Sequence, residues 1–294
     1  MKRSLLLIPL ILIPALACRI SQAAPTSTVA ATAAALPGTI QSDVTYCTVD
    51  GVDLKMDVYP AAAPSGPAPA IVWVHGGGWT GGDKLGQYAD WLVPLSRAGF
   101  VGFSLNYRLA PLYKFPAMIE DVKCAIRSIR AHAADYGVNP DKIGVVGGSA
   151  GGHLVALLGT TDASAGFDVG QYMDQSSRVQ AVVDLFGPSD LSLLFPGKTG
   201  AERIFGSFDL QKASPLSYVG AADPPFLILQ GDKDTTVPPE QSKMLYDRLA
   251  GAGVPARLVI VKNAGHGFVP VGGAIDPNLE QIYQIILDFF KQNL

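Results

Sequence analysis

From residue 70 onward, short continuous apolar runs alternate with longer mixed stretches. A continuous apolar run is typical of a strand that is buried on both faces of a sheet. Strands are expected near residues 70–75, 100–106, 142–147, 179–186, 225–230 and 256–262, and helices near 85–98, 117–136, 150–159, 239–251 and 277–292. This alternation predicts an α/β fold with a doubly wound, mostly parallel sheet.

Two earlier segments extend this sheet to eight strands. Residues 45–49 and 52–59 flank Asp50-Gly51, a strong hairpin signal, so the sheet is expected to begin with an antiparallel pair. The longest stretch without a strand runs from 187 to 224 and is expected to form a short lid insertion, well below the size of a cap domain. We therefore expect an open substrate pocket.

The motif Gly147-Gly148-Ser149-Ala150-Gly151 stands between the apolar run 143–146 and a helical segment. A serine with glycine two positions away on each side, at a strand-to-helix junction, is the pattern of a nucleophile elbow. The glycines are needed because a Cβ at 147 or 151 would collide with the neighbouring strand or helix. The alternative is a glycine-rich strand end without chemistry, since the chain has 32 glycines.

A second motif, His75-Gly76-Gly77-Gly78-Trp79, directly follows the buried run 70–74. Three consecutive glycines let the backbone turn its N–H groups toward a cavity, as in the oxyanion loop of lipases and esterases. The alternative is a plain flexible loop. This motif precedes the serine motif by about 70 residues, which is the order expected for such an enzyme. We expect Trp79, at the edge of the loop, to form part of the substrate pocket.

His266 lies between two glycines directly after the last strand, where a general base is needed to reach Ser149. The acid that orients the histidine ring is expected after the preceding strand, and Asp234 is the preferred residue. Asp232 is two residues away and is expected to point elsewhere. Asp190 follows an earlier strand and is the third candidate, with a turn or helix-capping role as its alternative.

The other three histidines have structural explanations. His132 falls in a charged, alanine-rich helix and is expected at the surface. His153, in the first turn after Ser149, is expected to pack or to form hydrogen bonds rather than to act as a base. His75 is expected to brace the oxyanion loop.

Together these motifs resemble the α/β-hydrolases of the hormone-sensitive-lipase-like esterase group, close to the bacterial branch that includes feruloyl and acetylxylan esterases. The resemblance covers the chain from about Val44 to its end. Besides the two glycine motifs, it is carried by Asn106-Tyr107-Arg108-Leu109-Ala110-Pro111, Phe115-Pro116-Ala117, Asp121, residues 231–238 and Gly265-His266-Gly267-Phe268.

The resemblance implies an α/β-hydrolase fold with Ser149 as nucleophile, Asp234 as acid and His266 as base. It also implies an oxyanion hole in the glycine loop, made of Gly76, Gly77, Gly78 and Ala150, with the N–H groups of the last three as donors.

The resemblance also bears on two positions beside the catalytic residues. One departure is Gln230, where relatives often have a histidine; that residue is not catalytic in the group. Arg108 and Asp121 are expected to pair beneath the active-site loops as scaffold.

These residues predict a serine hydrolase that cleaves carboxylic esters through an acyl-enzyme. A shallow pocket beside Trp79 favours short acyl chains in a small-molecule or saccharide ester. Alternatives are an acetyl or feruloyl esterase of plant polysaccharide, a serine peptidase of the prolyl-oligopeptidase type, and a non-catalytic binding module.

Composition agrees with an enzyme of one domain, because 294 residues with 48% hydrophobic and 16% charged residues can bury a large core. The net charge of −3, without a clustered basic face, disfavours a nucleic-acid partner. The sequence has no HExxH, CxxC, GxGxxG or phosphate-loop motif, so we expect neither a metal nor a cofactor.

The amino terminus predicts export. Residues 1–23 have the basic start and short apolar stretch of a signal peptide, with cleavage after Ala17 or Ala23. Cleavage after Ala17 would leave Cys18 to carry lipid and attach the protein to a membrane. Residues 24–43 are expected to form a flexible tether rich in Ala, Thr and Pro, and residues 44–294 the catalytic domain. The protein is accordingly expected to be secreted, periplasmic or lipid-anchored to the cell envelope.

Cys47 and Cys124 are the two cysteines of the expected catalytic domain. Export permits a disulfide between them, but the sequence supplies no geometry, so a pair of buried free thiols is the default expectation.

Overall fold

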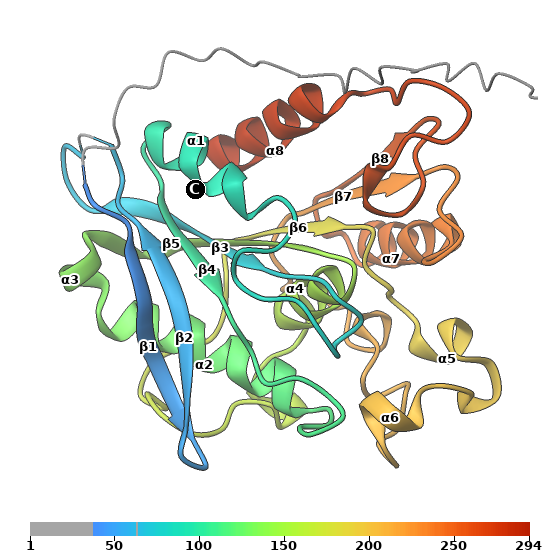
Figure 1. The fold of residues 1–294 in the computed structure, drawn as a ribbon, viewed down its shortest axis with the longest axis horizontal. Helices are drawn as coiled ribbons and strands as arrows, with labels where there is room; N and C mark the ends of the chain where they lie inside the picture. The colour runs from blue at the N-terminus through green and yellow to red at the C-terminus, as the bar shows by residue number, and fades with distance from the viewer. Residues whose placement is uncertain (1–37, 63) are drawn as a thin grey trace, which may run out of the picture. The chain divides into compact units, whose positions relative to one another are not determined.

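The computed structural model describes residues 38–62 and 64–294. In them, eight strands form one sheet in the order β1-β2-β4-β3-β5-β6-β7-β8 (Figure 1). Two antiparallel pairings join β1 to β2 and β2 to β4, and all the others are parallel. The predicted eight-stranded, mostly parallel sheet is confirmed. The strands are β1 (Gln41–Val49), β2 (Val52–Tyr59), β3 (Ala68–Val74), β4 (Val101–Leu105), β5 (Val138–Gly148), β6 (Ala181–Leu185), β7 (Phe226–Gly231) and β8 (Ala256–Val261).

The β1–β2 connection is the tight hairpin predicted from Asp50-Gly51. Val49 faces Val52 across it, and both turn residues have positive φ, 50° and 79°. A two-residue turn with positive φ at both positions matches the twist of the flanking strands, which is why this dipeptide favours a hairpin.

Helices cover both faces of the sheet. The α-helices are α1 (Leu92–Arg97), α2 (Ala117–Ala131), α3 (Ala133–Tyr136), α4 (Ala150–Thr160), α5 (Leu191–Leu194), α6 (Glu202–Phe205), α7 (Pro239–Gly251) and α8 (Leu279–Asn293). Single 3₁₀ turns are η1 (Ala89–Trp91), η2 (Ala163–Ala165), η3 (Pro196–Lys198), η4 (Pro215–Ser217) and η5 (His266–Phe268). The helix predicted at 85–98 is shorter than expected, and the one predicted at 117–136 is interrupted at His132.

The core forms two layers because successive strand residues point to opposite faces of the sheet. Val72 of β3 belongs to the apolar layer that includes side chains of α2, α4 and α7. Its neighbours Ile71 and Trp73 belong to the layer that includes side chains of α1 and α8. Figure 1 shows α1 and α8 together along one face of the sheet. The continuous apolar runs of the sequence are therefore strands covered on both sides.

The segment between β6 and β7 has no strand, as predicted, and contains only α5, α6 and two 3₁₀ turns. Its apolar side chains Leu191, Phe205 and Ala213 are buried in the same layer as α2 and α4. None of residues 187–224 lines the cavity at Ser149. The segment is therefore a packed insertion that does not line this cavity.

Cys47 of β1 and Cys124 of α2 form a disulfide, with their Cα atoms 6.5 Å apart. The default expectation of free thiols is therefore wrong. The sequence separates the two residues by 77 positions, and only the packing of α2 against β1 brings them into bonding range.

The predicted signal peptide, Cys18 and most of the predicted tether lie outside the described residues. The sheet begins at Gln41, three residues before the expected start of the catalytic domain. In the described part of the chain, no helix is both long enough and apolar enough to cross a membrane.

Candidate active site

Ser149 lies in the sharp turn between β5 and α4, with φ 56° and ψ −118°. This is a disfavoured conformation for a residue with a side chain. A Cβ on Gly147 would lie 2.5 Å from the carbonyl oxygen of Gly151, and one on Gly151 would lie 2.1 Å from that of Val74. Glycine is thus required at both positions because neighbouring backbone occupies the space, as the sequence motif predicts.

Three residues from three strand ends meet at the carboxyl edge of the sheet. The Nε2 atom of His266 lies 2.8 Å from Oγ of Ser149, and its Nδ1 atom lies 2.7 Å from Oδ2 of Asp234. Asp234 follows β7 and His266 follows β8. Since parallel strands end at the same edge, residues far apart in sequence become neighbours there. The structure brings together the serine, histidine and aspartate that sequence reasoning preferred.

Asp234 is held in its charged form by several donors. Its Oδ1 atom accepts hydrogen bonds from the N–H groups of Thr236 and Val237, each at 2.9 Å. Burial raises its pKa, but the hydrogen bonds from His266 and Val237 outweigh burial and hold the pKa below its usual value. A charged carboxylate here accepts the Nδ1 proton of His266 and leaves Nε2 facing the serine as a proton acceptor.

The other candidate acids have different partners. Asp190 caps the first turn of α5, where its Oδ1 atom accepts from the N–H groups of Ser192 and Leu193. Asp232 accepts a hydrogen bond from the N–H of Ala264 at 3.3 Å. The capping interpretation of Asp190 is thus confirmed, and neither aspartate is bonded to His266.

His153 is a buried hydrogen-bonding residue. Its Nε2 atom donates to the carbonyl of Ala213 at 2.7 Å, and its Nδ1 atom accepts from the indole of Trp79. Burial lowers its pKa to about 4, so the ring is neutral. The interpretation of His153 as a packing residue is confirmed.

His75 and His132 also make local contacts. Nδ1 of His75 lies 2.6 Å from the carbonyl oxygen of Gly76, and the His75 ring stacks on Tyr107, so it braces the oxyanion loop as expected. Nδ1 of His132 lies 2.9 Å from the carbonyl of Ser128, and the residue is partly exposed at the break between α2 and α3.

The glycine loop faces the serine. A Cβ on Gly76 would lie 2.7 Å from the carbonyl oxygen of Gly148, and one on Gly77 would lie 2.1 Å from that of Gly81. Gly77 has φ 113° and Gly78 has φ 60°. In the part of the chain that the structure describes, their N–H groups donate to no backbone carbonyl. The N–H of Ala150, the first residue of α4, is likewise free of an intrahelical partner because of its position.

A cavity of about 480 Å³ opens at Ser149. Its walls are the glycine loop, residues 86–88 and the aromatic rings of Trp73, Tyr88 and Phe186, with His266 and Thr236 on the remaining side. The ring of Phe186 stands edge-on to His266, with centroids 4.9 Å apart.

Trp79 is not among the cavity-lining residues, so its predicted place in the substrate pocket is wrong. The residue is only 4% exposed, and its indole packs against His153, Phe195 and Phe205. Trp79 belongs to the apolar core, where two of its ring contacts, Phe195 and Phe205, come from the 187–224 insertion.

Arg108 and Asp121 form the buried ion pair that the sequence predicts. Nη2 of Arg108 lies 2.7 Å from Oδ1 of Asp121, and the backbone N–H of Arg108 donates to Oδ2 of the same carboxylate. The pair ties the chain after β4 to α2, which supports the interpretation of both residues as scaffold.

Sequence reasoning missed several residues that support the site. Gln230, which the sequence marks only as a departure from the family pattern, donates from its Nε2 atom to Asp234 at 3.1 Å. Gln87, Tyr88 and Phe186 carry no motif. Their roles depend on contacts across more than 75 residues of sequence, so no local signal could reveal them.

Asp184 lies on β6 beside the serine turn and is fully buried. Its Oδ1 atom accepts from the N–H of Gly187 at 2.8 Å, whereas Oδ2 has no partner in the described residues. Burial raises the pKa of this carboxyl to about 7. A Cβ on Gly152 of α4 would lie 2.4 Å from Oδ1, so the carboxyl packs directly against the helix that Ser149 begins.

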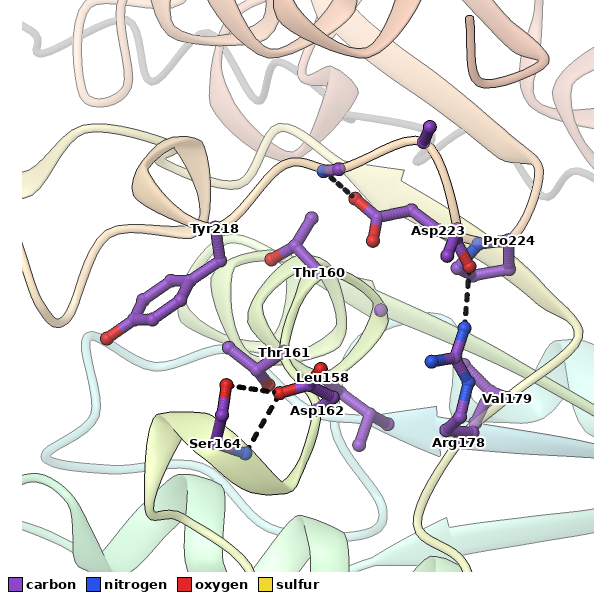
Figure 2. A pocket seen from close by; sticks show the side chains of 14 residues that line it. Leu158, Thr160, Thr161, Asp162, Ser164, Arg178, Val179, Tyr218, Asp223 and Pro224 are labelled. Atoms are coloured by element: carbon purple, nitrogen blue, oxygen red, sulfur yellow. Dashed lines mark hydrogen bonds between the residues drawn. The ribbon is translucent and has the colours of Figure 1, made fainter. Parts of the chain in front are cut away.

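A second cavity, of about 230 Å³, lies near the end of α4 and the amino ends of β6 and β7, opposite the edge where Ser149 sits. Figure 2 shows its polar side chains engaged with local backbone: Asp162 accepts from Ser164, and Arg178 donates to the carbonyl of Ala222. Among the described residues, no group of three or more His, Cys, Asp or Glu side chains is placed to hold a metal ion.

Residues 56–249 match the family model BD-FAE. The chain belongs to the BD-FAE family. The match includes the glycine loop, the serine turn and Asp234, so the family assignment and the geometry at the sheet edge concern the same part of the molecule. The resemblance to hormone-sensitive-lipase-like α/β-hydrolases is thereby confirmed.

This BD-FAE chain is similar to a probable carboxylic ester hydrolase, LipM, of Mycobacterium tuberculosis, with 34% identity over 197 residues, which are 63% of this chain and 46% of LipM. The chain spans about half the length of the curated relatives that it matches first.

Solved structures cover more of the BD-FAE chain. A truncated carbohydrate esterase from gut microbiota matches with a TM-score of 0.74 and 29% identity, over 87% of this chain and 96% of its own. Esterase 2 of Thermogutta terrifontis, phosphorylated by paraoxon, matches with a TM-score of 0.75 and 30% identity. The match covers 88% of this chain and 95% of the esterase chain. The same thermophilic esterase has been solved with propionate and with butyrate bound. These structures confirm the α/β-hydrolase fold.

Proposed function

We propose that this chain hydrolyses carboxylic esters, with Ser149 as nucleophile, His266 as general base and Asp234 as the acid that orients the histidine. The observation that carries the proposal is the continuous set of hydrogen bonds from Asp234 through His266 to Ser149, at 2.7 and 2.8 Å. The intact serine, histidine, aspartate and oxyanion loop disfavour a non-catalytic binding module.

The hydrogen bonds between Asp234, His266 and Ser149 support the following order of proton transfers. His266 takes the Oγ proton of Ser149 at Nε2 while Oγ attacks the ester carbonyl carbon. When the tetrahedral intermediate collapses, His266 gives that proton to the departing alcohol oxygen and an acyl-serine remains. Water then loses a proton to His266 and attacks the acyl carbon. When this second tetrahedral intermediate collapses, the bond from the acyl carbon to Oγ breaks, His266 returns the proton to Oγ of Ser149, and the carboxylic acid is released. Asp234 stays charged throughout and stabilises the imidazolium that forms in each half-reaction.

The oxyanion is proposed to rest on the N–H groups of Gly77, Gly78 and Ala150, with Gly76 allowing the loop to approach Ser149. Gly76 has no room for a side chain against the carbonyl of Gly148, so the loop lies against the serine turn. Donors fixed in advance stabilise the charge that develops in the transition state without reorganisation.

The substrates that fit this proposal best are esters of short acyl chains. The support is that a similar esterase binds propionate and butyrate. Trp79 gives the proposal no support, because its side chain is buried in the core and does not line the cavity. A saccharide ester is a second candidate, supported by the similarity to a carbohydrate esterase.

We further propose that the protein is exported, through the signal peptide predicted at residues 1–23, and attached to a membrane if Cys18 carries lipid. The Cys47–Cys124 disulfide supports export, since disulfides persist mainly in oxidising compartments.

Nitrophenyl esters of acyl chains from two to sixteen carbons, assayed beside acetylated xylan and feruloyl esters, test the substrate proposal. Each CH₂ buried in an apolar pocket contributes about 0.8 kcal/mol, so a deep pocket would give a kcat/KM that rises steadily with chain length. We expect a maximum at about two to four carbons, because longer chains would remain in water. A maximum at about eight carbons or beyond would overturn the short-acyl proposal.

Labelling with paraoxon tests the nucleophile separately. A stoichiometric mass increase on the peptide that contains Ser149, with parallel loss of esterase activity, is the expected result. Absence of both labelling and ester hydrolysis in folded protein would overturn the proposed function.

A further inference from the structure

The backbone carbonyl of Gly267, next to His266, accepts two side-chain hydrogen bonds from a distant segment of the chain. The hydroxyl of Tyr88 donates to it at 2.8 Å, and Nε2 of Gln87 donates at 3.2 Å. The segments are separated by 179 and 180 residues. Both donors precede η1, on the stretch that continues from the glycine loop, and both also line the cavity at Ser149.

The loop that carries His266 has an intrinsically disfavoured backbone. Gly267 has φ 67° and Phe268 has φ 54°, so two consecutive residues adopt the left-handed region directly after the histidine. Phe268 has a side chain, which makes that conformation costly for it. Internal bonds from Phe268 to Gly265 and from Gly265 to Val269 close the turn but leave the Gly267 carbonyl to the outside partners. An external restraint on this carbonyl therefore affects where His266 is held.

Tyr88 is itself fixed in place. Its ring stacks on Trp91, with centroids 4.3 Å apart, and stands edge-on to Trp73 at 6.4 Å. Burial raises its pKa to about 12, so the hydroxyl keeps its proton at any pH at which the enzyme would work. Gln87, by contrast, is exposed, and water competes for its bond. Tyr88 is thus the more rigid of the two donors.

We infer that Tyr88 and Gln87 are positioning residues, which hold the Gly267 carbonyl and through it keep Nε2 of His266 against Oγ of Ser149. The inference rests on the proposed function and adds residues that no motif marks. Neither side chain takes part in proton transfer. They connect the side of the site that carries the oxyanion loop to the side that carries the base.

The shared carbonyl sets a specific expectation for mutants. In Tyr88→Phe the Gln87 amide still restrains Gly267, and in Gln87→Ala the Tyr88 hydroxyl does. A typical hydrogen bond contributes enough to change a rate by about three- to tenfold, so we expect kcat losses of about that size for Tyr88→Phe and smaller ones for Gln87→Ala. The double variant loses both restraints, and its loss should exceed the product of the single losses.

The experiment measures kcat and KM of the full protein on nitrophenyl acetate for both single variants and the double variant, with thermal unfolding of each. Phenylalanine keeps the ring that lines the cavity, so KM should stay within about twofold while kcat falls. Tyr283→Phe is the matched control: this half-buried tyrosine packs against the same Trp91 and is not bonded to Gly267. It should keep wild-type kcat.

The possible outcomes distinguish a failure of the positioning role from a failure of the proposed function. Active wild-type protein with a double variant of unchanged kcat overturns the positioning role alone. Variants of Tyr88 and Gln87 that lose thermal stability but keep kcat also overturn it. A kcat loss in Tyr283→Phe as large as that in Tyr88→Phe overturns it as well. Wild-type protein that is folded but neither hydrolyses esters nor is labelled by paraoxon overturns the proposed function instead.

Discussion

Gln230 and His266 both donate to the same carboxylate oxygen, Oδ2 of Asp234, at 3.1 and 2.7 Å. Gln230 is fully buried on β7, and its own Oε1 atom accepts from the hydroxyl of Ser242 on α7. The Gln230 amide thus connects Asp234 to α7. The hydrogen bond from Gln230 helps to orient the aspartate.

Replacing Gln230 by methionine should lower kcat by about tenfold with little change in KM, because Asp234 loses a donor that fixes its orientation. Steady-state kinetics on nitrophenyl acetate measure this. Gln241→Met is the control, since Gln241 is equally buried but holds Ser189 and Asp190. Both changes should destabilise the fold, and only the first should reduce kcat. Equal kcat losses would contradict the proposed role of Gln230.

Ser149→Ala should fold normally and lose on the order of 10⁴–10⁶ of kcat, as expected for removal of a nucleophile. Asp234→Asn should lose less, through the wrong histidine tautomer. Asp190→Asn should have almost no effect, because asparagine caps a helix as well as aspartate does. Kinetics of the three purified variants test this. If Asp190→Asn proved the more damaging aspartate change, the assignment of the acid would be wrong.

Asp184 should make a contribution to the stability of the protein that falls as pH rises. The folded protein holds the Asp184 proton until pH about 7, whereas the unfolded chain releases it near 3.8. A carboxyl whose pKa is raised by folding stabilises the folded state at pH values below its pKa in the unfolded chain. This contribution is lost as the pH rises through its pKa in the folded protein. The loss amounts to about 4 kcal/mol in total by pH 8.

Asp184→Asn should remove most of this dependence. Its free energy of unfolding, relative to that of wild type, should therefore be larger at pH 8 than at pH 4, so the variant gains relative stability as pH rises. Urea unfolding at both pH values measures the difference. A constant difference between the two proteins would show that Asp184 does not titrate in this range.

The Cys47–Cys124 bond should stabilise the fold without affecting catalysis. It closes a loop of 77 residues, and a disulfide of this kind contributes about 2–5 kcal/mol. The double variant Cys47→Ser, Cys124→Ser should unfold at lower temperature and should no longer respond to dithiothreitol, while its kcat at 25 °C stays close to wild type. Thermal unfolding with and without reductant measures this. Identical melting curves for all four samples would contradict it.

Membrane attachment should depend on Cys18. If the signal peptide is cleaved after Ala17 and Cys18 carries lipid, Cys18→Ser should move the protein from the membrane fraction to the soluble fraction, because an unlipidated tether has no anchor. Immunoblots of fractionated cells expressing full-length protein show the distribution. A soluble distribution of both forms would favour cleavage after Ala23 and plain secretion.

Short contiguous motifs allowed the sequence alone to predict the sheet, the serine turn, the glycine loop and the position of His266. Continuous apolar runs indicate strands that are covered on both faces, and glycines at 147 and 151 indicate a turn with no room for side chains. These are local constraints, each confined to a few consecutive residues, so the amino-acid order carries them completely. The preference for Asp234 over Asp190 also followed from local order, since the acid should follow the strand before the one that precedes the histidine.

Other features were decided only by the tertiary structure. They depend on the direction of side chains and on contacts between residues that are far apart in the sequence. Trp79 follows the glycine loop in sequence, but its indole is buried in the core and does not line the cavity. Cys47 and Cys124 meet because α2 packs on β1, and Tyr88 reaches Gly267 across 179 residues. Side-chain direction at a turn, and proximity between elements, arise from how the layers pack. No pattern within a few consecutive residues encodes them, which is why the restraint on His266 appeared only in the folded molecule.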